Sequence, residues 1–257
     1  MNITIGFIEE YYVKSMNLCR SGRWRAPIRT RFGSPASGKI TFAGATLALA
    51  FAALPVQAQE WSQHFAFDDR FSIDLPTEPS IDETTYETEY GFILPARIYT
   101  AEDNFGTYSV TAVDWSEAES LHTEAYEACE RATGDLRGGD NPGHCSRLYY
   151  EREIRGATLH AAFGLLERGS EVTHLGSANT EMVEGIGIQL LNEDGSRSHA
   201  VIFWHNYHLF IANAIAPQGM PPPLLFSTSL GFLDEEGGRI TYGERYSPLE
   251  PVPPRTR

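Results

Sequence analysis

Short segments in which apolar and polar residues alternate restrict most strongly how this chain can fold. The segments "FAFDDRFSIDLPTEP" (65–79) and "FGTYSVTAVDW" (105–115) show the pattern, and further strands are predicted at about 171–177, 182–191, 198–204 and 207–215. A period of two places every second side chain on one face, as in a half-buried strand. The turn sequence "NEDG" and Gly91 mark hairpins. The pattern predicts antiparallel strands.

The period changes to that of a helix in two segments of the middle region. The segment "SEAESLHTEAYEACERATG" begins at Ser116 and ends at Gly134, and "RGATLHAAFGLLERG" ends at Gly169. We expect their apolar faces to be formed by Leu121, Ala125, Ala128 and Ala132 and by Leu159, Ala162, Phe163 and Leu166. A shorter helix is predicted around 224–230. The fold class expected is therefore α+β, with an antiparallel β-sheet flanked by helices.

Residues 1–58 resemble a secretory signal peptide. Six basic residues between Arg20 and Lys39 precede the apolar run "ITFAGATLALAFAALPV", and an A-x-A-like end predicts cleavage after Ala58. The alternative is a membrane anchor, although about 17 apolar residues are at the lower limit for spanning a bilayer. A start at Met16 would make the signal more compact, which leaves open whether residues 1–15 are translated. We expect a periplasmic or secreted protein with no membrane span after cleavage.

The remaining chain is expected to hold one periplasmic α+β domain at 59–242 and a disordered, proline-rich tail at 243–257. Residues 59–257 carry 13 basic and 32 acidic residues, a net charge of −19. Such a charge repels nucleic acid and anionic lipid surfaces. No lysine follows Lys39, which excludes P-loop, pyridoxal-phosphate and Ser-x-x-Lys chemistry after cleavage.

Cys129 and Cys145 are the two cysteines that remain after the predicted cleavage. An even number of cysteines in an exported chain indicates a disulfide. The segment between them is rich in Gly, Asp and Asn, and closing a loop of about 15 residues would stabilise the fold by roughly 3 kcal/mol. The alternative is a redox or metal site, for which C-x-x-C or several nearby histidines would be typical.

Two histidines lie beside aromatic residues in "SRSHAVIFWHNYHLFIANAI" (196–215). We interpret His205 and Asn206 as a two-residue turn between strands, because Asn tolerates positive φ. His205 and His208 are three residues apart, and a chelating pair on one strand requires a spacing of two. We therefore expect no metal site and no cofactor here. Trp204, His205, Tyr207 and His208 form instead the candidate binding surface, although a core position is favoured for Trp204 and Tyr207.

The order of several segments carries a resemblance to a family. These are "W…F…D.FSIDLP…P", "Y.T..G..LPA..Y" and the closing "DGSRSHAVIFWHNYHLFIANAIAP…P…LFSTSLGFLDEEGGRI". The chain resembles exported proteobacterial proteins of uncharacterised role, which are similar in layout to the PsbP and Mog-type α/β/α sandwich. The resemblance implies a central antiparallel sheet with helices on both sides. It also implies a binding or assembly role, without naming a partner, because the binding residues of those proteins do not map onto this chain.

Catalytic signatures such as G-x-S-x-G and H-E-x-x-H do not occur in the sequence. The sequence therefore favours an exported, non-catalytic domain that binds a protein or supports an envelope assembly. The alternative is a hydrolase or small-ligand-binding protein with a dispersed site, recognisable by a concave pocket that gathers polar side chains from separate strands. A third reading, sequestration of cations by the acidic surface, remains weaker.

Overall fold

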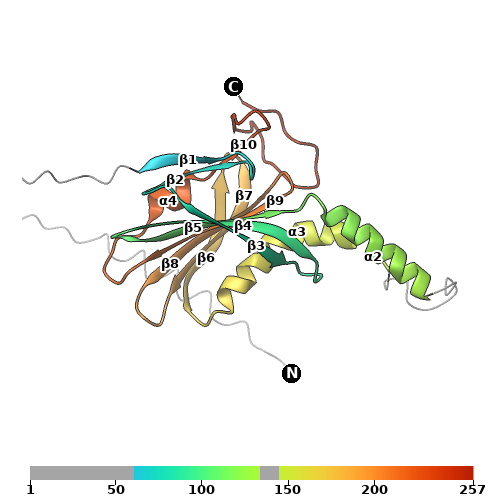
Figure 1. Ribbon diagram of the computed structural model, residues 1–257, viewed down its shortest axis with the longest axis horizontal. Helices are drawn as coiled ribbons and strands as arrows, with labels where there is room; N and C mark the ends of the chain where they lie inside the picture. Colours follow the sequence, from blue (N-terminus) through green and yellow to red (C-terminus); the bar gives the residue numbers. More distant parts are fainter. Residues whose placement is uncertain (1–60, 134–144, 257) are drawn as a thin grey trace, which may run out of the picture. The chain divides into compact units, whose positions relative to one another are not determined.

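The computed structural model describes residues 61–133 and 145–256 (Figure 1). The predicted signal peptide at 1–58, the start at Met16 and the interior of the cysteine loop lie outside the described residues. The described chain is α+β, as predicted, and its strands form two antiparallel sheets.

The larger sheet has seven strands in the order β3-β4-β5-β9-β8-β7-β6, and every neighbouring pair is antiparallel. Its strands are β3 (Ser80–Glu87), β4 (Ile93–Asp103), β5 (Gly106–Asp114), β6 (Glu171–Thr180), β7 (Val183–Leu191), β8 (Arg197–His205) and β9 (His208–Ala216). The hairpin prediction at "NEDG" is confirmed, because Gly195 has φ of +79° between β7 and β8. Gly91, with φ of +80°, lies likewise in the turn between β3 and β4.

The smaller sheet has the order β1-β2-β10-β11, and sequence analysis did not anticipate it as a separate sheet. It consists of β1 (Ser62–Ala66), β2 (Phe71–Leu75), β10 (Gly231–Leu233) and β11 (Arg239–Ile240). Phe71, Ile73 and Leu75 alternate along β2 and are fully buried, as expected for one face of a strand in the segment 65–79. Because β2 pairs with β10 near the other end of the chain, the two termini of the domain are joined in this sheet.

The two faces of the larger sheet are covered differently (Figure 1). Helix α3 (Tyr149–Leu166) packs on β7, β8 and β9 from one side. The smaller sheet and the short helix α4 (Leu224–Ser229) cover the other side, where Phe71 contacts Tyr99 and Phe210 contacts Phe232. Alternation along β5 directs Tyr108, Val110 and Ala112 into this second layer. The core therefore lies mainly between the two sheets, where aromatic side chains meet.

The helix positions were predicted more accurately than their buried faces. Helix α2 (Ala118–Thr133) contacts α3 near its start and extends away from the sheet (Figure 1), so Ala125, Ala128 and Ala132 are exposed rather than buried. On α3, the predicted face is also wrong in part: Leu159 and Phe163 are 52% and 53% exposed. The buried face consists of Glu153, Ile154, Ala157, Ala161, Ala162 and Leu165.

The tail from 243 onward packs on the domain instead of being disordered. Tyr246 is buried and forms a bridge with Val183, and its hydroxyl accepts a hydrogen bond of 3.0 Å from the backbone amide of Asn206. Further along, Arg255 donates to Asp234 at 2.7 Å. Aromatic packing by Tyr246 fixes an otherwise polar, proline-rich segment, so the packed chain extends beyond the boundary predicted at 242.

Candidate functional site

The turn between β8 and β9 lies one residue later than predicted. Asn206 and Tyr207 occupy its two central positions, with φ of 45° and 62°. A tight two-residue turn of this kind requires positive φ at both positions. His205 and His208 therefore close the hairpin as a directly opposed pair of the β8–β9 register. Opposed residues of neighbouring strands share a face, so both imidazoles lie on the side of the smaller sheet.

Two of the predicted site residues are core residues. His205 is 2% exposed, its ring stacks on Phe232 at 4.3 Å, and its Nε2 lies 2.8 Å from the Tyr242 hydroxyl. Burial, followed by the electrostatic effects of His208 and Arg255, lowers the pKa of His205 to about 3. Trp204 is 5% exposed on the opposite face. Neither side chain can therefore meet a partner protein without unfolding of the hairpin.

The other two predicted residues are more accessible. His208 is half-buried, and its Nδ1 lies 3.1 Å from the Asn206 carbonyl oxygen. Tyr207 is 48% exposed, and its ring meets Trp204 edge-on at 6.0 Å. Its carbonyl oxygen accepts a hydrogen bond of 2.8 Å from the amide of Trp115, which connects the turn to the segment entering α2. Only Tyr207 of the four offers a large surface.

Three further tyrosines lie around the base of α2, one of them, Tyr150, near Tyr207, and sequence analysis missed them. Tyr90 of the β3–β4 turn contacts the Tyr149 ring at 5.3 Å and the His122 ring at 5.6 Å, and Tyr150 contacts the His122 ring at 5.7 Å. Burial, and then the nearby Tyr207, raises the pKa of Tyr150 to about 12. We call Tyr90, Tyr149, Tyr150 and Tyr207 the aromatic surface. They come from three segments, and no local pattern in the sequence unites them.

A buried polar pair holds these segments together. His122 of α2 and Glu153 of α3 approach to 2.5 Å between Nε2 and Oε2, and Glu153 is 0% exposed. The other carboxylate oxygen of Glu153 accepts a hydrogen bond of 3.1 Å from the amide of Tyr90. The Phe92 ring packs against His122 at 4.6 Å. One carboxylate therefore connects α3, α2 and the β3–β4 turn beneath the aromatic surface.

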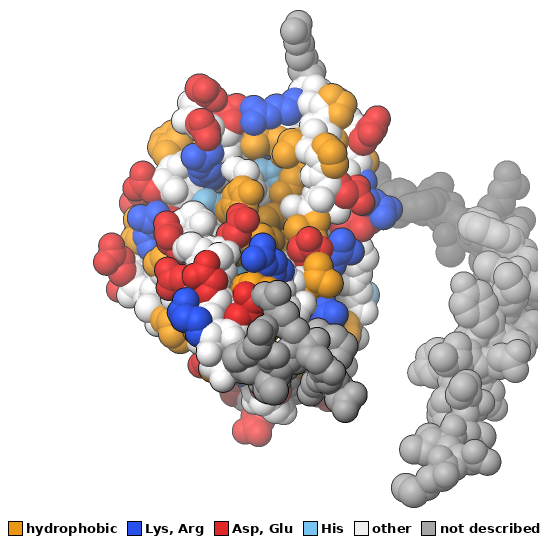
Figure 2. All heavy atoms as spheres, turned by 90° about the vertical axis from the view of Figure 1, so that its right-hand side faces the viewer, with side chains coloured by type: hydrophobic (Ala, Val, Ile, Leu, Met, Phe, Trp, Pro, Cys, Tyr) orange, Lys and Arg blue, Asp and Glu red, His pale blue; other side chains and the backbone are white. Residues whose placement is uncertain are grey.

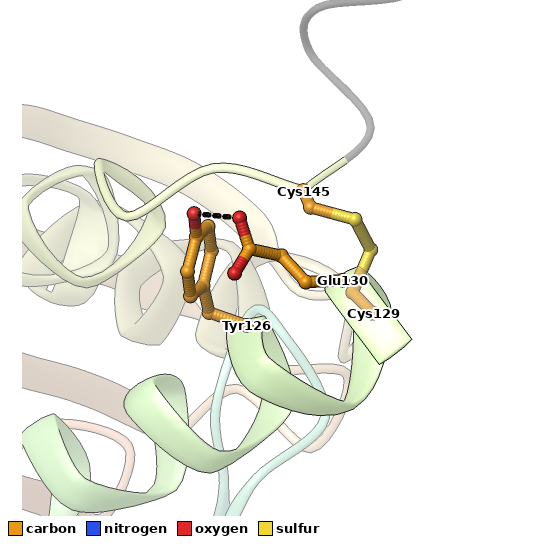
Figure 3. Close-up of a disulfide and its surroundings, with 4 residues drawn as sticks. All are labelled: Tyr126, Cys129, Glu130 and Cys145. Carbon is orange, nitrogen blue, oxygen red and sulfur yellow. Dashed lines mark hydrogen bonds between the residues drawn. A yellow bond between two sulfur atoms is a disulfide. The ribbon is translucent and has the colours of Figure 1, made fainter. Parts of the chain in front are cut away.

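Helix α2 is an acidic arm that begins at this surface. Its exposed side chains include Glu119, Glu124, Glu127 and Glu130, against the single arginine Arg131. The predicted disulfide is confirmed: Cys129 is bonded to Cys145, with 5.7 Å between the two Cα atoms (Figure 3). It ties the far part of the arm to the segment that leads into α3.

Tyrosine and arginine side chains add to this tether. Figure 3 shows the Tyr126 hydroxyl directed at the Glu130 carboxylate, to which it donates a hydrogen bond. The Arg147 guanidinium lies 4.7 Å from the centre of the Tyr126 ring. A second arginine, Arg152, lies 5.8 Å from the centre of the Tyr149 ring in the aromatic surface. Tyrosine faces in this region are thus already used to bind guanidinium groups.

The face from which α2 extends mixes several kinds of side chain. Figure 2 views that side and shows acidic and basic side chains around hydrophobic ones. Within ranges 61–133 and 145–256, no group of three or more His, Cys, Asp or Glu side chains is placed to hold a metal ion. In the same ranges, no helix is long and apolar enough to cross a bilayer. Comparison with models of known protein families gives no match, and no curated protein matches the chain significantly.

Proposed function

We propose that this protein is an exported, non-catalytic domain that binds another protein through the aromatic surface and the acidic arm. The observation that carries the proposal is the placement of two neighbouring tyrosine pairs, Tyr90 with Tyr149 and Tyr150 with Tyr207, at the base of a helix whose far part is tethered by a disulfide. Tyrosine is enriched among residues that dominate binding energy, because it buries a large rigid area with little loss of side-chain entropy. The missing catalytic motifs and the resemblance to binding and assembly proteins agree with this role.

The charge of the arm indicates the chemistry of the partner. Four glutamates and one arginine on α2 create a negative field next to exposed tyrosine rings. A partner segment rich in arginine or lysine would be attracted to this field and could place its cations over the rings. Arg147 and Arg152 already illustrate this geometry within the chain.

Export is part of the proposal. The basic and apolar pattern of residues 1–58 supports it, and so does the disulfide, because disulfides persist in oxidising compartments such as the periplasm. We propose that the protein works in the periplasm or outside the cell. Fractionation of the source cells, with immunodetection of the processed chain, tests this placement separately from binding.

Quantitative affinity purification from envelope extract tests the binding proposal. The tagged protein is compared with a Tyr149→Ser/Tyr207→Ser variant and with Phe105→Ser, a matched control at a turn distant from α2 where Phe105 is 50% exposed. We expect one protein to be recovered with the wild type and with Phe105→Ser, and to be lost with the tyrosine variant. Equal recovery with all three proteins would refute the proposed surface.

A further inference from the structure

Two hollows lie on the α3 side of the larger sheet, beside the last turn of α3. One measures about 340 Å³ and the other about 440 Å³. Leu165, Arg168 and Asn213 line both, so the two hollows flank the same helix end. Both lie away from the aromatic surface, which is formed at the start of α3. They exist because a single helix covers only part of a seven-stranded sheet.

The smaller hollow gathers polar side chains from separate elements. Ser109 and Thr111 of β5 and Asn213 of β9 contribute from the sheet, while Tyr86 of β3 and His160 of α3 contribute from its sides. Ile98 and Ile211 supply apolar surface between them. Apolar walls with a few convergent polar groups are typical of small-molecule sites, whose volumes begin at about 300 Å³.

Two buried polar atoms in this hollow lack a partner in the part of the chain that the structure describes. They are the Tyr86 hydroxyl and Oδ1 of Asn213. An unpaired buried polar group costs about 1–3 kcal/mol, so such groups are uncommon unless they serve a purpose. Burial, and then the charge of Glu153, raises the pKa of Tyr86 to about 12, so its hydroxyl keeps its proton and can donate. One donor and one acceptor therefore lie unpaired just beneath the lining of the hollow, and a ligand reaches them only after a small shift of the Tyr86 and Asn213 side chains.

The charge of the lining selects among ligands. Arg168 and His160 line the smaller hollow and no carboxylate does. Arg168 forms no ion pair with any described residue, whereas Arg97, Arg239 and Arg255 each contact an acidic side chain. The larger hollow is less suited to an anion, because Glu193 and Asp194 line it. An unpaired arginine beside hydroxyl and amide groups is the arrangement that recognises a carboxylate.

We infer that the smaller hollow binds a small hydroxylated carboxylate, of the size and chemistry of a sugar acid. The carboxylate meets Arg168 at the rim. After a small shift of both side chains, one ligand hydroxyl accepts from Tyr86 and another donates to Asn213 Oδ1, while the carbon skeleton lies on Ile98 and Ile211. The site is independent of the protein-binding surface, so either proposal can fail without the other.

NMR titration of the full exported chain tests this inference. The probes are D-glucuronate, D-galacturonate and D-gluconate, each compared with D-glucose as the neutral counterpart, and the signals followed are the Asn213 side-chain amide and the Arg168 Nε–H. We expect saturable shifts with at least one acid and weaker binding of glucose. Replacing Arg168 removes a charge-assisted hydrogen bond, so Arg168→Gln should weaken binding at least about tenfold.

Matched variants separate recognition from loss of fold. Arg155→Gln removes an exposed arginine of α3 that lies outside the hollow, and it should leave binding unchanged. Tyr86→Phe should weaken binding while the protein stays folded. The inference is overturned if none of the acids shifts the Asn213 amide at about 10 mM, a concentration that detects even millimolar affinity. It is also overturned if glucose binds as tightly as the acids, or if Arg168→Gln and Arg155→Gln behave alike.

Discussion

Replacing Glu153 by leucine tests how α2, α3 and the β3–β4 turn are joined. The Glu153 side chain is fully buried and serves two groups, the His122 imidazole at 2.5 Å and the Tyr90 amide at 3.1 Å. Leucine has a similar volume but accepts no hydrogen bond, so both groups lose their partner. At about 1–3 kcal/mol for each buried polar group left unsatisfied, Glu153→Leu should lower the free energy of unfolding by about 2–6 kcal/mol.

Urea unfolding followed by tryptophan fluorescence measures the loss, and hydrogen exchange locates it. We expect faster exchange at the Tyr90 amide and through the first turns of α2, with little change in the central strands β5, β8 and β9. The matched control is the double variant His122→Phe/Glu153→Leu, which removes both polar side chains and leaves only the Tyr90 amide unpaired. It should recover stability relative to the single variant, because replacing both partners by apolar groups avoids most of the penalty.

Two outcomes would refute this reasoning. If Glu153→Leu lowers stability by less than about 1 kcal/mol, the Glu153 contacts contribute no more than an exposed pair. If the loss of unfolding free energy in the double variant equals the sum of the losses in the two single variants, the two side chains act independently and do not form a joint. Unchanged exchange at Tyr90 would separately exclude the proposed anchoring of the turn.

Three further perturbations follow from other parts of the structure. The pKa of His205 is lowered to about 3 in the folded state, so the unfolded chain binds the proton first as the pH falls. The free energy of unfolding should therefore decrease as the pH drops from about 6.5 toward 3, by up to about 1.4 kcal/mol per pH unit. Urea titrations at several pH values measure this slope, and His205→Gln should flatten it. Cys129 and Cys145 are separated by 16 positions in the sequence, so replacing both by serine should lower the free energy of unfolding by about 3 kcal/mol. An unchanged urea midpoint would contradict this expectation. Tyr86→Phe removes a buried hydroxyl that has no partner among the described residues, so it should leave thermal stability unchanged or raise it. If the free energy of unfolding falls by more than about 1 kcal/mol, the hydroxyl has a hydrogen-bond partner in solution.

The strands could be predicted where burial alternates with a period of two. On β5, Tyr108, Val110 and Ala112 are buried on one face, as their spacing indicated. The smaller sheet escaped prediction because β10 has three residues and β11 has two, too few to show a period. Pairing of β2 with β10 depends on residues that are far apart in sequence, and only tertiary packing determines it.

The helix faces show how hydrophobicity alone can mislead. On α3, the large residues Leu159 and Phe163 were expected in the core, yet the small residues Ala157 and Ala161 are buried there. Small side chains allow the helix to approach the sheet closely. The close packing gained in this way outweighs the free energy that burying larger side chains would contribute. The two exposed residues therefore lie on the outer face.

Of the four residues predicted for the candidate site, Tyr207 alone is largely exposed. A one-residue shift of the turn gave Asn206 and Tyr207 the central positions and left His205 in the buried strand. The remaining tyrosines of the aromatic surface come from the β3–β4 turn and the start of α3. Their proximity depends on the buried contacts of Glu153. Sequence analysis could not reveal these contacts, because a charged residue in a helical pattern is normally assigned to the solvent face.

Site-specific photo-crosslinking tests the central claim most directly. p-Benzoylphenylalanine is introduced at Tyr207 and, as a control, at Phe105, which is equally exposed at the opposite end of β5. After irradiation of intact cells, we predict a crosslink from position 207 to one protein, at an arginine- or lysine-rich segment identified by mass spectrometry, and no such product from position 105. Crosslinking of the same protein from both positions, or of none from position 207, would contradict the account.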